Sequence, residues 1–326
     1  MAGTLLSIVI GLAGLVIGAD FLVRGAVGIA QRLGVSSLLI GLTLVAFGTS
    51  VPETATAIHA VLAGAPGMAV GNIVGANIAD CLLIVGVAAT IAPVAVPESL
   101  IRREGSALTV ATLLFVAWGT SFPLGRASGA AMLVLLGLYL WLTISQETVP
   151  DDRDDETTAA DLAHAEGWRF AFRRWAGAFP VASGLALVAG GLLLIVTSGR
   201  AFVDGAVGLA HLLGVSNSVI GLSVVAMGTT TPELVTSAVA ALRGRPGLAL
   251  GNAIGSCFYN LLGIGGVIGL LGPVPIPEGV ARFDFPVLVA ATLLVLVLAS
   301  TGRRIARLEG LALIACYGVY LYALFR

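Results

Sequence analysis

The sequence has 326 residues, of which 58% are hydrophobic and 11% are charged, and its formal net charge is −1. With a mean hydropathy of +1.03, it is more apolar than a soluble core of this size requires and is typical of a helical membrane bundle. The near-neutral charge excludes a nucleic-acid-binding surface, and the three cysteines, all in apolar stretches, favour packed residues over a disulfide framework or a metal cluster.

Apolar stretches long enough to cross the bilayer follow one another along the chain. In the first part they cover about 3–23, 36–62, 68–92, 106–123 and 127–145. After an acidic break they resume at about 178–199, 215–241, 248–271, 285–301 and 306–325. Backbone polar groups in lipid must be satisfied within each segment, so the stretches are predicted to be helices. We expect an all-α integral membrane protein with ten transmembrane helices.

An internal repeat divides the chain. Val23–Glu98 aligns without gaps on Val203–Glu278, at a constant offset of 180 residues, and roughly half of the aligned positions are identical. Each half holds an odd number of spans, so the second half enters the membrane from the opposite side, as in many secondary transporters. The predicted units are a first five-helix repeat (1–145), an acidic linker (146–177) and a second, inverted five-helix repeat (178–326).

The distribution of arginine predicts the orientation. All 17 basic residues are Arg, and only four fall on one face of the predicted bundle: Arg126, Arg200, Arg282 and Arg326. The arginine-rich face should be cytoplasmic. We therefore expect a multi-pass protein of the cell membrane with both termini outside and the linker, interpreted as solvated, inside.

The second and seventh spans carry polar residues at mid-depth. Gly48–Glu53 reads GTSVPE and Gly228–Glu233 reads GTTTPE. Proline kinks a helix and frees carbonyl oxygens, so an interruption is predicted at mid-depth in both spans. Each Glu lies one turn after a Thr, on the same helix face. These hard oxygen ligands suit Na⁺ and Ca²⁺ better than zinc or copper.

The third and eighth spans supply further polar groups. Gly71–Asp80 reads GNIVGANIAD and Gly251–Asn260 reads GNAIGSCFYN. Asp80 and Asn260 occupy equivalent positions, so they are predicted to face each other across the pseudo-two-fold axis. Asn72 and Asn252 fit either a site or a structural tie between helices.

The alternative is a purely structural role, in which Glu53, Glu233 and Asp80 are buried carboxylates paired with arginine. Their spans contain no Arg or Lys, and each unpaired charge at the bilayer centre costs roughly 2.5–3.5 kcal/mol. We therefore expect bound cations or protons to neutralise these carboxylates, and we predict that the three residues have a functional and not a structural role.

These motifs resemble those of the cation/calcium exchanger superfamily, in particular its sodium/calcium exchanger branch of prokaryotic type, and the resemblance covers nearly the whole chain. It implies a Ca²⁺ site made by Glu53 and Glu233 with backbone oxygens of Thr49 and Thr229. It implies flanking Na⁺ sites at Ala46 and Ser50 on one side and at Ala226, Thr230 and Ser256 on the other, with Asp80 and Asn260 at the centre.

The sequence departs from the family pattern at two places. The usual pattern has Asn in the first repeat and Asp in the second, whereas here Asp80 and Asn260 are exchanged. Ala76 stands where a Ser is expected, which removes one hydroxyl from a Na⁺ position. The number of bound Na⁺ ions is therefore left open.

The expected function is Na⁺-driven Ca²⁺ antiport by alternating access, with Ca²⁺ and Na⁺ as transported ions and the lipid bilayer as the environment. No ATP motif, organic cofactor or enzyme motif is recognised, and a monomer is the expected state. Proton- or potassium-coupled exchange of calcium or another divalent cation remains an alternative, and a cation channel is a weaker one because a channel needs a continuous pore.

Overall fold

The computed structural model describes residues 2–96, 98–146, 180–212 and 226–324. The first half contains α1 (Ala2–Leu33), α2 (Ser37–Ile40), η1 (Gly41–Val45), α3 (Ala46–Thr49), α4 (Val51–Leu62), α5 (Pro66–Ala79), η2 (Asp80–Ile84), α6 (Val85–Ile91), α7 (Glu98–Leu100), η3 (Ile101–Gly105), α8 (Ser106–Ser121) and α9 (Arg126–Ser145). The second half contains α12 (Pro180–Leu212), α14 (Ala226–Leu242), α15 (Pro246–Phe258), η5 (Tyr259–Ile264), α16 (Gly265–Leu271), η6 (Val280–Asp284), α17 (Phe285–Gly302) and α18 (Arg307–Leu324). The η segments are π-helical turns.

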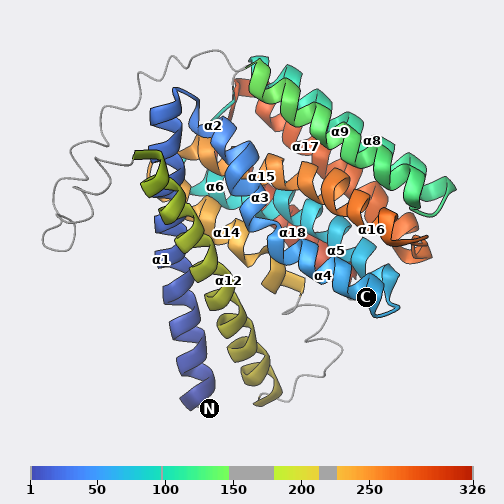
Figure 1. Cartoon of the computed structure of the whole chain (residues 1–326), viewed down its shortest axis with the longest axis horizontal. Helices are drawn as coiled ribbons and strands as arrows, with labels where there is room; N and C mark the ends of the chain where they lie inside the picture. The colour runs from blue at the N-terminus through green and yellow to red at the C-terminus, as the bar shows by residue number, and fades with distance from the viewer. Residues whose placement is uncertain (1, 97, 147–179, 213–225, 325–326) are drawn as a thin grey trace, which may run out of the picture.

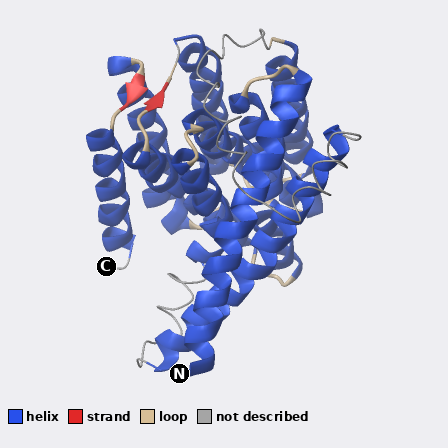
Figure 2. Ribbon diagram, turned by 90° about the vertical axis from the view of Figure 1, so that its left-hand side faces the viewer, coloured by secondary structure: helices blue, strands red, loops and turns tan. Residues whose placement is uncertain are grey.

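The two long helices α1 and α12 lie side by side along one flank of the molecule (Figures 1 and 2). Glycines bring their backbones together: a Cβ added at Gly18 would lie 2.9 Å from the Gly191 carbonyl oxygen, and one at Gly25 would lie 2.7 Å from the Gly184 carbonyl oxygen. Because the later position in α1 meets the earlier position in α12, the two helices are antiparallel.

The remaining helices form the body of the molecule. The larger hydrophobic cluster joins α4–α6, α8 and α9 to α15–α18, whereas a second cluster is built mainly on α1 and α12 and touches α14 and the start of α15. In the body, Gly105 approaches Leu296 and Gly119 approaches Phe285, so α8 and α17 run antiparallel. Residues of both halves thus share one core.

A two-stranded antiparallel pair, β1 (Val94–Ala95) with β2 (Arg304–Ile305), adds to the expected all-helical architecture. It joins the segment before α7 to the segment after α17, and the Val96 amide donates to the Arg303 carbonyl at 2.8 Å. The pairing satisfies backbone groups at a point where both chains leave their helices.

Seven helices in the described part of the chain are long and apolar enough to cross a membrane, and the bent pair Ser37–Thr49 and Val51–Leu62 would make an eighth span. The arrangement of ten spans stays a prediction. The first helix is longer than the predicted 3–23, because Asp20 and Arg24 form an ion pair at 2.8 Å within it and the helix continues to Leu33. Of the predicted linker 146–177, all but Gln146 lies outside the described residues.

Candidate functional site

The second span is bent where the sequence predicts an interruption. The axes of Ser37–Thr49 and Val51–Leu62 differ by 41°, and Pro52 stands in the first turn of α4, where its missing N–H costs no helical hydrogen bond. This break places Glu53 in the first turn of α4, next to Thr49 and Ser50. All three side chains are at most 2% exposed.

The seventh span differs from that expectation, because α14 continues from Ala226 through Pro232 to Leu242. A single lost backbone hydrogen bond is tolerated inside a membrane helix when neighbouring groups compensate for it. Glu233 is 1% exposed and Thr230 is 7% exposed. Ala226 begins the helix, but its side chain lies outside those that the structure describes.

The motifs of the third and eighth spans both end in π-helical turns that carry the central polar residues. Asp80 begins η2 after α5, and Asn260 is the second residue of η5 after α15. The side-chain amide of Asn260 donates to Asp80 Oδ2 at 3.4 Å. The structure therefore brings these repeat-equivalent residues face to face, and single π-helical turns of this kind are frequent at functional sites.

Two hydrogen bonds cross between the halves in a symmetric way. Thr49 Oγ1 donates to Asn252 Oδ1 at 3.1 Å, and Thr229 Oγ1 donates to Asn72 Oδ1 at 3.3 Å. The Asn252 amide also donates to the backbone oxygen of Glu233 at 3.3 Å and to Ser237 Oγ at 2.9 Å. Both asparagines thus tie one repeat to the other, and Asn252 also holds the backbone at Glu233.

The carboxylates approach one another across the centre of the bundle. Ser50 Oγ donates to Glu233 Oε1 at 3.4 Å, again across the two halves. Glu233 interacts electrostatically with Glu53 and Asp80, and Asp80 interacts with Glu53. Within the described residues, no group of three or more His, Cys, Asp or Glu side chains is arranged to hold a metal ion.

Buried polar atoms without a hydrogen-bond partner gather around these residues. They are Glu53 Oε1 and Oε2, Glu233 Oε2, Asp80 Oδ1, Asn260 Oδ1, Ser256 Oγ, Asn77 Oδ1, Thr236 Oγ1 and Asn72 Nδ2. All but one of these atoms are oxygens. Since an unsatisfied buried acceptor is costly, a concentration of them indicates a site for positive charge.

The sequence motifs identify most of this cluster and leave part of it out. Ala46 packs on α15, where a Cβ at Gly255 would lie 2.6 Å from the Ala46 Cβ, so this position meets the opposite repeat. The predicted site leaves out Asn77, Thr236 and Ser237, all at most 1% exposed. Asn77 aligns with Cys257 and Ser237 with Ala57, so repeat symmetry gives no signal for these two, whereas Thr236 aligns with Thr56. A polar residue in an apolar span could still have flagged each one.

The whole chain is similar to known membrane exchangers. The family model for the sodium/calcium exchanger protein matches residues 3–145 and 183–326. The chain is 36% identical over 323 residues to a putative antiporter, CaxA, of Alkalimonas amylolytica, covering 98% of this chain and 97% of that one. It is 33% identical to the sodium/calcium exchanger MaX1 of Methanosarcina acetivorans, covering 98% of both.

The fold is also similar to that of a solved exchanger structure. The sodium-calcium exchanger NCX_Mj superposes with a TM-score of 0.82 at 30% identity, covering 98% of each chain. These relatives are transporters, not enzymes. The chain therefore belongs to the sodium/calcium exchanger family of membrane cation/calcium antiporters.

Proposed function

We propose that this antiporter exchanges Na⁺ for Ca²⁺ by alternating access at one shared site lined by Glu53, Glu233, Asp80 and Asn260. The observation that carries the proposal is the cluster of buried, unpartnered oxygens contributed by both halves. Glu53 has neither of its carboxylate oxygens hydrogen-bonded, although its side chain is 1% exposed. A bound cation supplies the missing partner for these oxygens.

The buried charges of this site make a bound cation necessary for the cycle. Each isolated charge at the membrane centre costs roughly 2.5–3.5 kcal/mol, so three carboxylates would cost about 8–10 kcal/mol without compensation. None of the ion pairs described in the structure involves Glu53, Glu233 or Asp80. Ca²⁺ and Na⁺ compete for the same negative charges, which couples the two ions without ATP.

The ligand chemistry favours these two cations. Carboxylate, amide, hydroxyl and carbonyl oxygens are hard donors, which Ca²⁺ and Na⁺ prefer. In this proposal Glu53 and Glu233 bind Ca²⁺ with backbone oxygens of Thr49 and Thr229. Na⁺ takes the flanking positions at Ala46, Ser50, Ala226, Thr230 and Ser256. Asp80 and Asn260 complete the centre.

The proposed architecture is two inverted five-helix repeats, 1–145 and 178–326, joined by a cytoplasmic linker, 146–177, with both termini outside. Three packing directions support it. α1 with α12 and α8 with α17 run antiparallel, as equivalent helices of inverted repeats must when the number of spans per repeat is odd. The second span and α15 run parallel, since Leu38 lies at Gly251 and Ala46 lies at Gly255.

Measuring ⁴⁵Ca²⁺ uptake tests the proposed function. Purified protein in liposomes loaded with Na⁺ and diluted into Na⁺-free buffer should take up Ca²⁺, and Glu53→Gln should abolish the uptake. Equal uptake under a proton or K⁺ gradient without Na⁺ would instead support the proton- or potassium-coupled alternative. Flux that needs no counter-ion and does not saturate would support a channel. Absence of any gradient-dependent uptake by the unmodified protein would contradict the proposal.

A further inference from the structure

A second pair of buried carboxylates recurs outside the proposed ion site. Glu104 is fully buried in η3 at the start of the fourth helix of the first half, and Asp284, at 9% exposure, lies in η6 at the start of the equivalent helix of the second half. They are related by the 180-residue offset of the repeat. The site described above uses neither of them.

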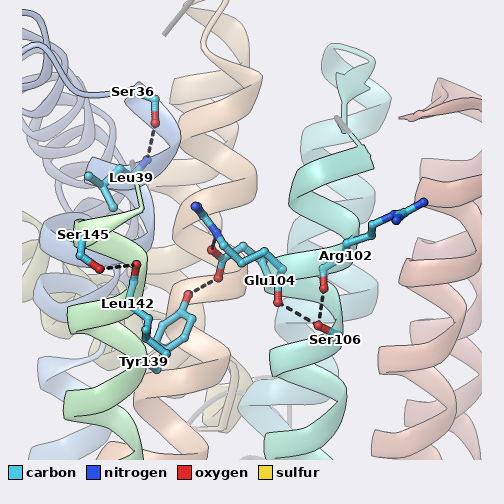
Figure 3. Close-up of polar contacts among 9 residues, drawn as sticks. Ser36, Leu39, Arg102, Glu104, Ser106, Tyr139, Leu142 and Ser145 are labelled. Atoms are coloured by element: carbon cyan, nitrogen blue, oxygen red, sulfur yellow. Dashed lines mark hydrogen bonds and ion pairs between the residues drawn. The ribbon is translucent and has the colours of Figure 1, made fainter. Parts of the chain in front are cut away.

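Each of these carboxylates accepts a hydrogen bond from a tyrosine of the following helix. Tyr139 Oη on α9 donates to Glu104 Oε2 at 2.6 Å, and Figure 3 shows the Tyr139 ring pointing its hydroxyl at that carboxylate. Tyr320 Oη on α18 donates to Asp284 Oδ1 at 2.9 Å. Arg103 Nε also lies 2.7 Å from Glu104 Oε1, so the charge of Glu104 is compensated. Glu104 is therefore a fixed anchor for the Tyr139 hydroxyl.

Tyr139 contacts the residue that immediately precedes the π-helical turn of the central site. The Tyr139 ring stacks on Phe258, with ring centroids 3.7 Å apart and an angle of 19° between the planes. Phe258 is 1% exposed and is the last residue of α15, immediately before the η5 turn that carries Asn260. Helix α9 also packs on η5 and α16: a Cβ at Gly129 would lie 2.6 Å from the Gly266 carbonyl oxygen, so no side chain separates the two backbones.

Resting on the proposed function, we propose that Tyr139, held by Glu104, is a positioning residue for Asn260 and acts through Phe258 on the η5 turn. A π-helical turn has one more residue per hydrogen-bonded ring than an α-helix and needs packing support to persist. The stacked ring provides that support through Phe258, which precedes the turn. Loss of the hydroxyl frees the ring, and the Asn260 amide then leaves its place beside Asp80.

Tyr139→Phe removes the anchor and keeps the aromatic ring, so it tests the proposal with little change in packing. Partners of metal ligands typically change ion affinity by about 10-fold to 100-fold when removed, and Tyr139 acts from one residue further out. We expect the half-saturating Ca²⁺ concentration for exchange to rise by up to about tenfold, with the maximal rate nearly unchanged. Glu104→Gln, which keeps an oxygen acceptor, should lose less affinity than Glu104→Leu.

A double-mutant cycle separates positioning from general structural damage. If Tyr139 acts through Asn260, the combination of Tyr139→Phe with Asn260→Ala should raise the half-saturating concentration no further than Asn260→Ala alone. Tyr322→Phe is the matched control, because it also removes a tyrosine hydroxyl, from a side chain on α18 that is 62% exposed. It should leave the half-saturating concentration unchanged.

Equilibrium ⁴⁵Ca²⁺ binding to the purified protein gives a readout that does not depend on transport. The positioning role would be overturned if Tyr139→Phe and Asn260→Ala together raised the half-saturating Ca²⁺ concentration by the product of their separate effects. It would also be overturned if Tyr139→Phe lowered the maximal rate and left the half-saturating concentration unchanged. Those outcomes do not contradict the proposed function, provided that the unmodified protein exchanges Na⁺ for Ca²⁺ and the Glu53→Gln variant does not. If the unmodified protein fails that exchange, the proposed function itself fails.

Discussion

At the scale of single residues, the central feature is that buried oxygens outnumber the donors available to them. Ser50 and Asn260 each donate one long hydrogen bond, at 3.4 Å, to Glu233 and Asp80, while Glu53 receives none. A carboxylate in this state destabilises the folded protein until a cation arrives. Ion binding and folding stability should therefore be linked at this site.

Glu53→Gln should change the response of thermal stability to Ca²⁺. The unmodified protein should be stabilised by Ca²⁺, by about 2.7 kcal/mol at a concentration 100 times the dissociation constant. The variant lacks one anionic ligand, so it should gain much less, while its stability in chelator should equal or exceed that of the unmodified protein because an unpaired buried charge is gone. Thermal unfolding of the purified protein with chelator and with Ca²⁺ measures both quantities.

Glu98→Gln is the control for this prediction, because it removes a carboxylate that is 46% exposed and paired with Arg303 at 2.7 Å. Its Ca²⁺-induced stabilisation should match that of the unmodified protein. An equal gain for Glu53→Gln and Glu98→Gln would show that Glu53 does not bind the ion.

Ala76 gives a second prediction at this scale, because its repeat equivalent Ser256 carries a fully buried hydroxyl without a partner. Ala76→Ser should add a matching oxygen ligand in the first half. The half-saturating Na⁺ concentration should then fall by roughly fivefold to tenfold, which corresponds to about 1–1.4 kcal/mol, and that for Ca²⁺ should change less. Na⁺-dependent ⁴⁵Ca²⁺ efflux from liposomes measures it.

The matched control is Ala69→Ser, which adds the same hydroxyl at a fully buried position of α5 two turns before Ala76. It should leave Na⁺ dependence unchanged. If both variants alter Na⁺ dependence equally, the hydroxyl at position 76 is not a Na⁺ ligand.

At the scale of helices, the sequence predicts the positions of the apolar segments well and their local geometry less well. Hydropathy alone predicts stretches at 127–145 and 285–301, close to the observed helices α9 (Arg126–Ser145) and α17 (Phe285–Gly302). The π-helical turns at Asp80 and Asn260 have no counterpart in the hydropathy pattern, because a π-helical turn is set by packing between helices. The two GT-x-x-PE motifs look alike, yet within the described residues the first marks a bend between two helices, whereas the second lies inside the continuous helix α14.

The hydrogen bonds between the two halves also cannot be predicted from the hydropathy pattern. The Thr49–Asn252 and Thr229–Asn72 bonds follow from the repeat only once the halves are interleaved. Asn77 and Ser237 escape a repeat-based search because their equivalents are Cys257 and Ala57. Symmetry identifies what the halves share and gives no information on what each half adds alone.

Glycine contacts between α1 and α12 give a prediction at this scale. A Cβ at Gly191 would lie 2.7 Å from the Gly18 carbonyl oxygen and from the Leu22 amide nitrogen, whereas one at Gly28 would meet nothing within 4 Å. Gly191→Ala should force the two backbones apart and lower the free energy of unfolding by about 1–3 kcal/mol. Gly28→Ala should be neutral or slightly stabilising because Ala favours helix. Thermal unfolding compares the two variants, and equal behaviour would show that the helices are not in close contact.

At the scale of the whole molecule, the question is which parts move. Helices α1 and α12 belong to the smaller hydrophobic cluster, which also includes residues of α14 and the start of α15. An ion pair joins the two parts: Arg243, in the turn after α14, lies 2.5 Å from Asp20 on α1. If the α1–α12 pair slides past the body to open one side, Asp20 and Arg243 must separate during each cycle.

Cross-linking tests this movement in a background in which the native cysteines, Cys81, Cys257 and Cys316, are replaced. Asp20→Cys combined with Arg243→Cys, joined by a short bifunctional thiol reagent, should arrest ⁴⁵Ca²⁺ exchange, and a reducible linker should restore it on cleavage. Glu98→Cys with Arg303→Cys is the matched control, because that ion pair also joins residues far apart in the sequence, but both of its segments belong to the body. Its cross-link should leave exchange running. Arrest by both cross-links would mean that the body itself deforms, and arrest by neither would mean that α1 stays fixed to the body throughout the cycle.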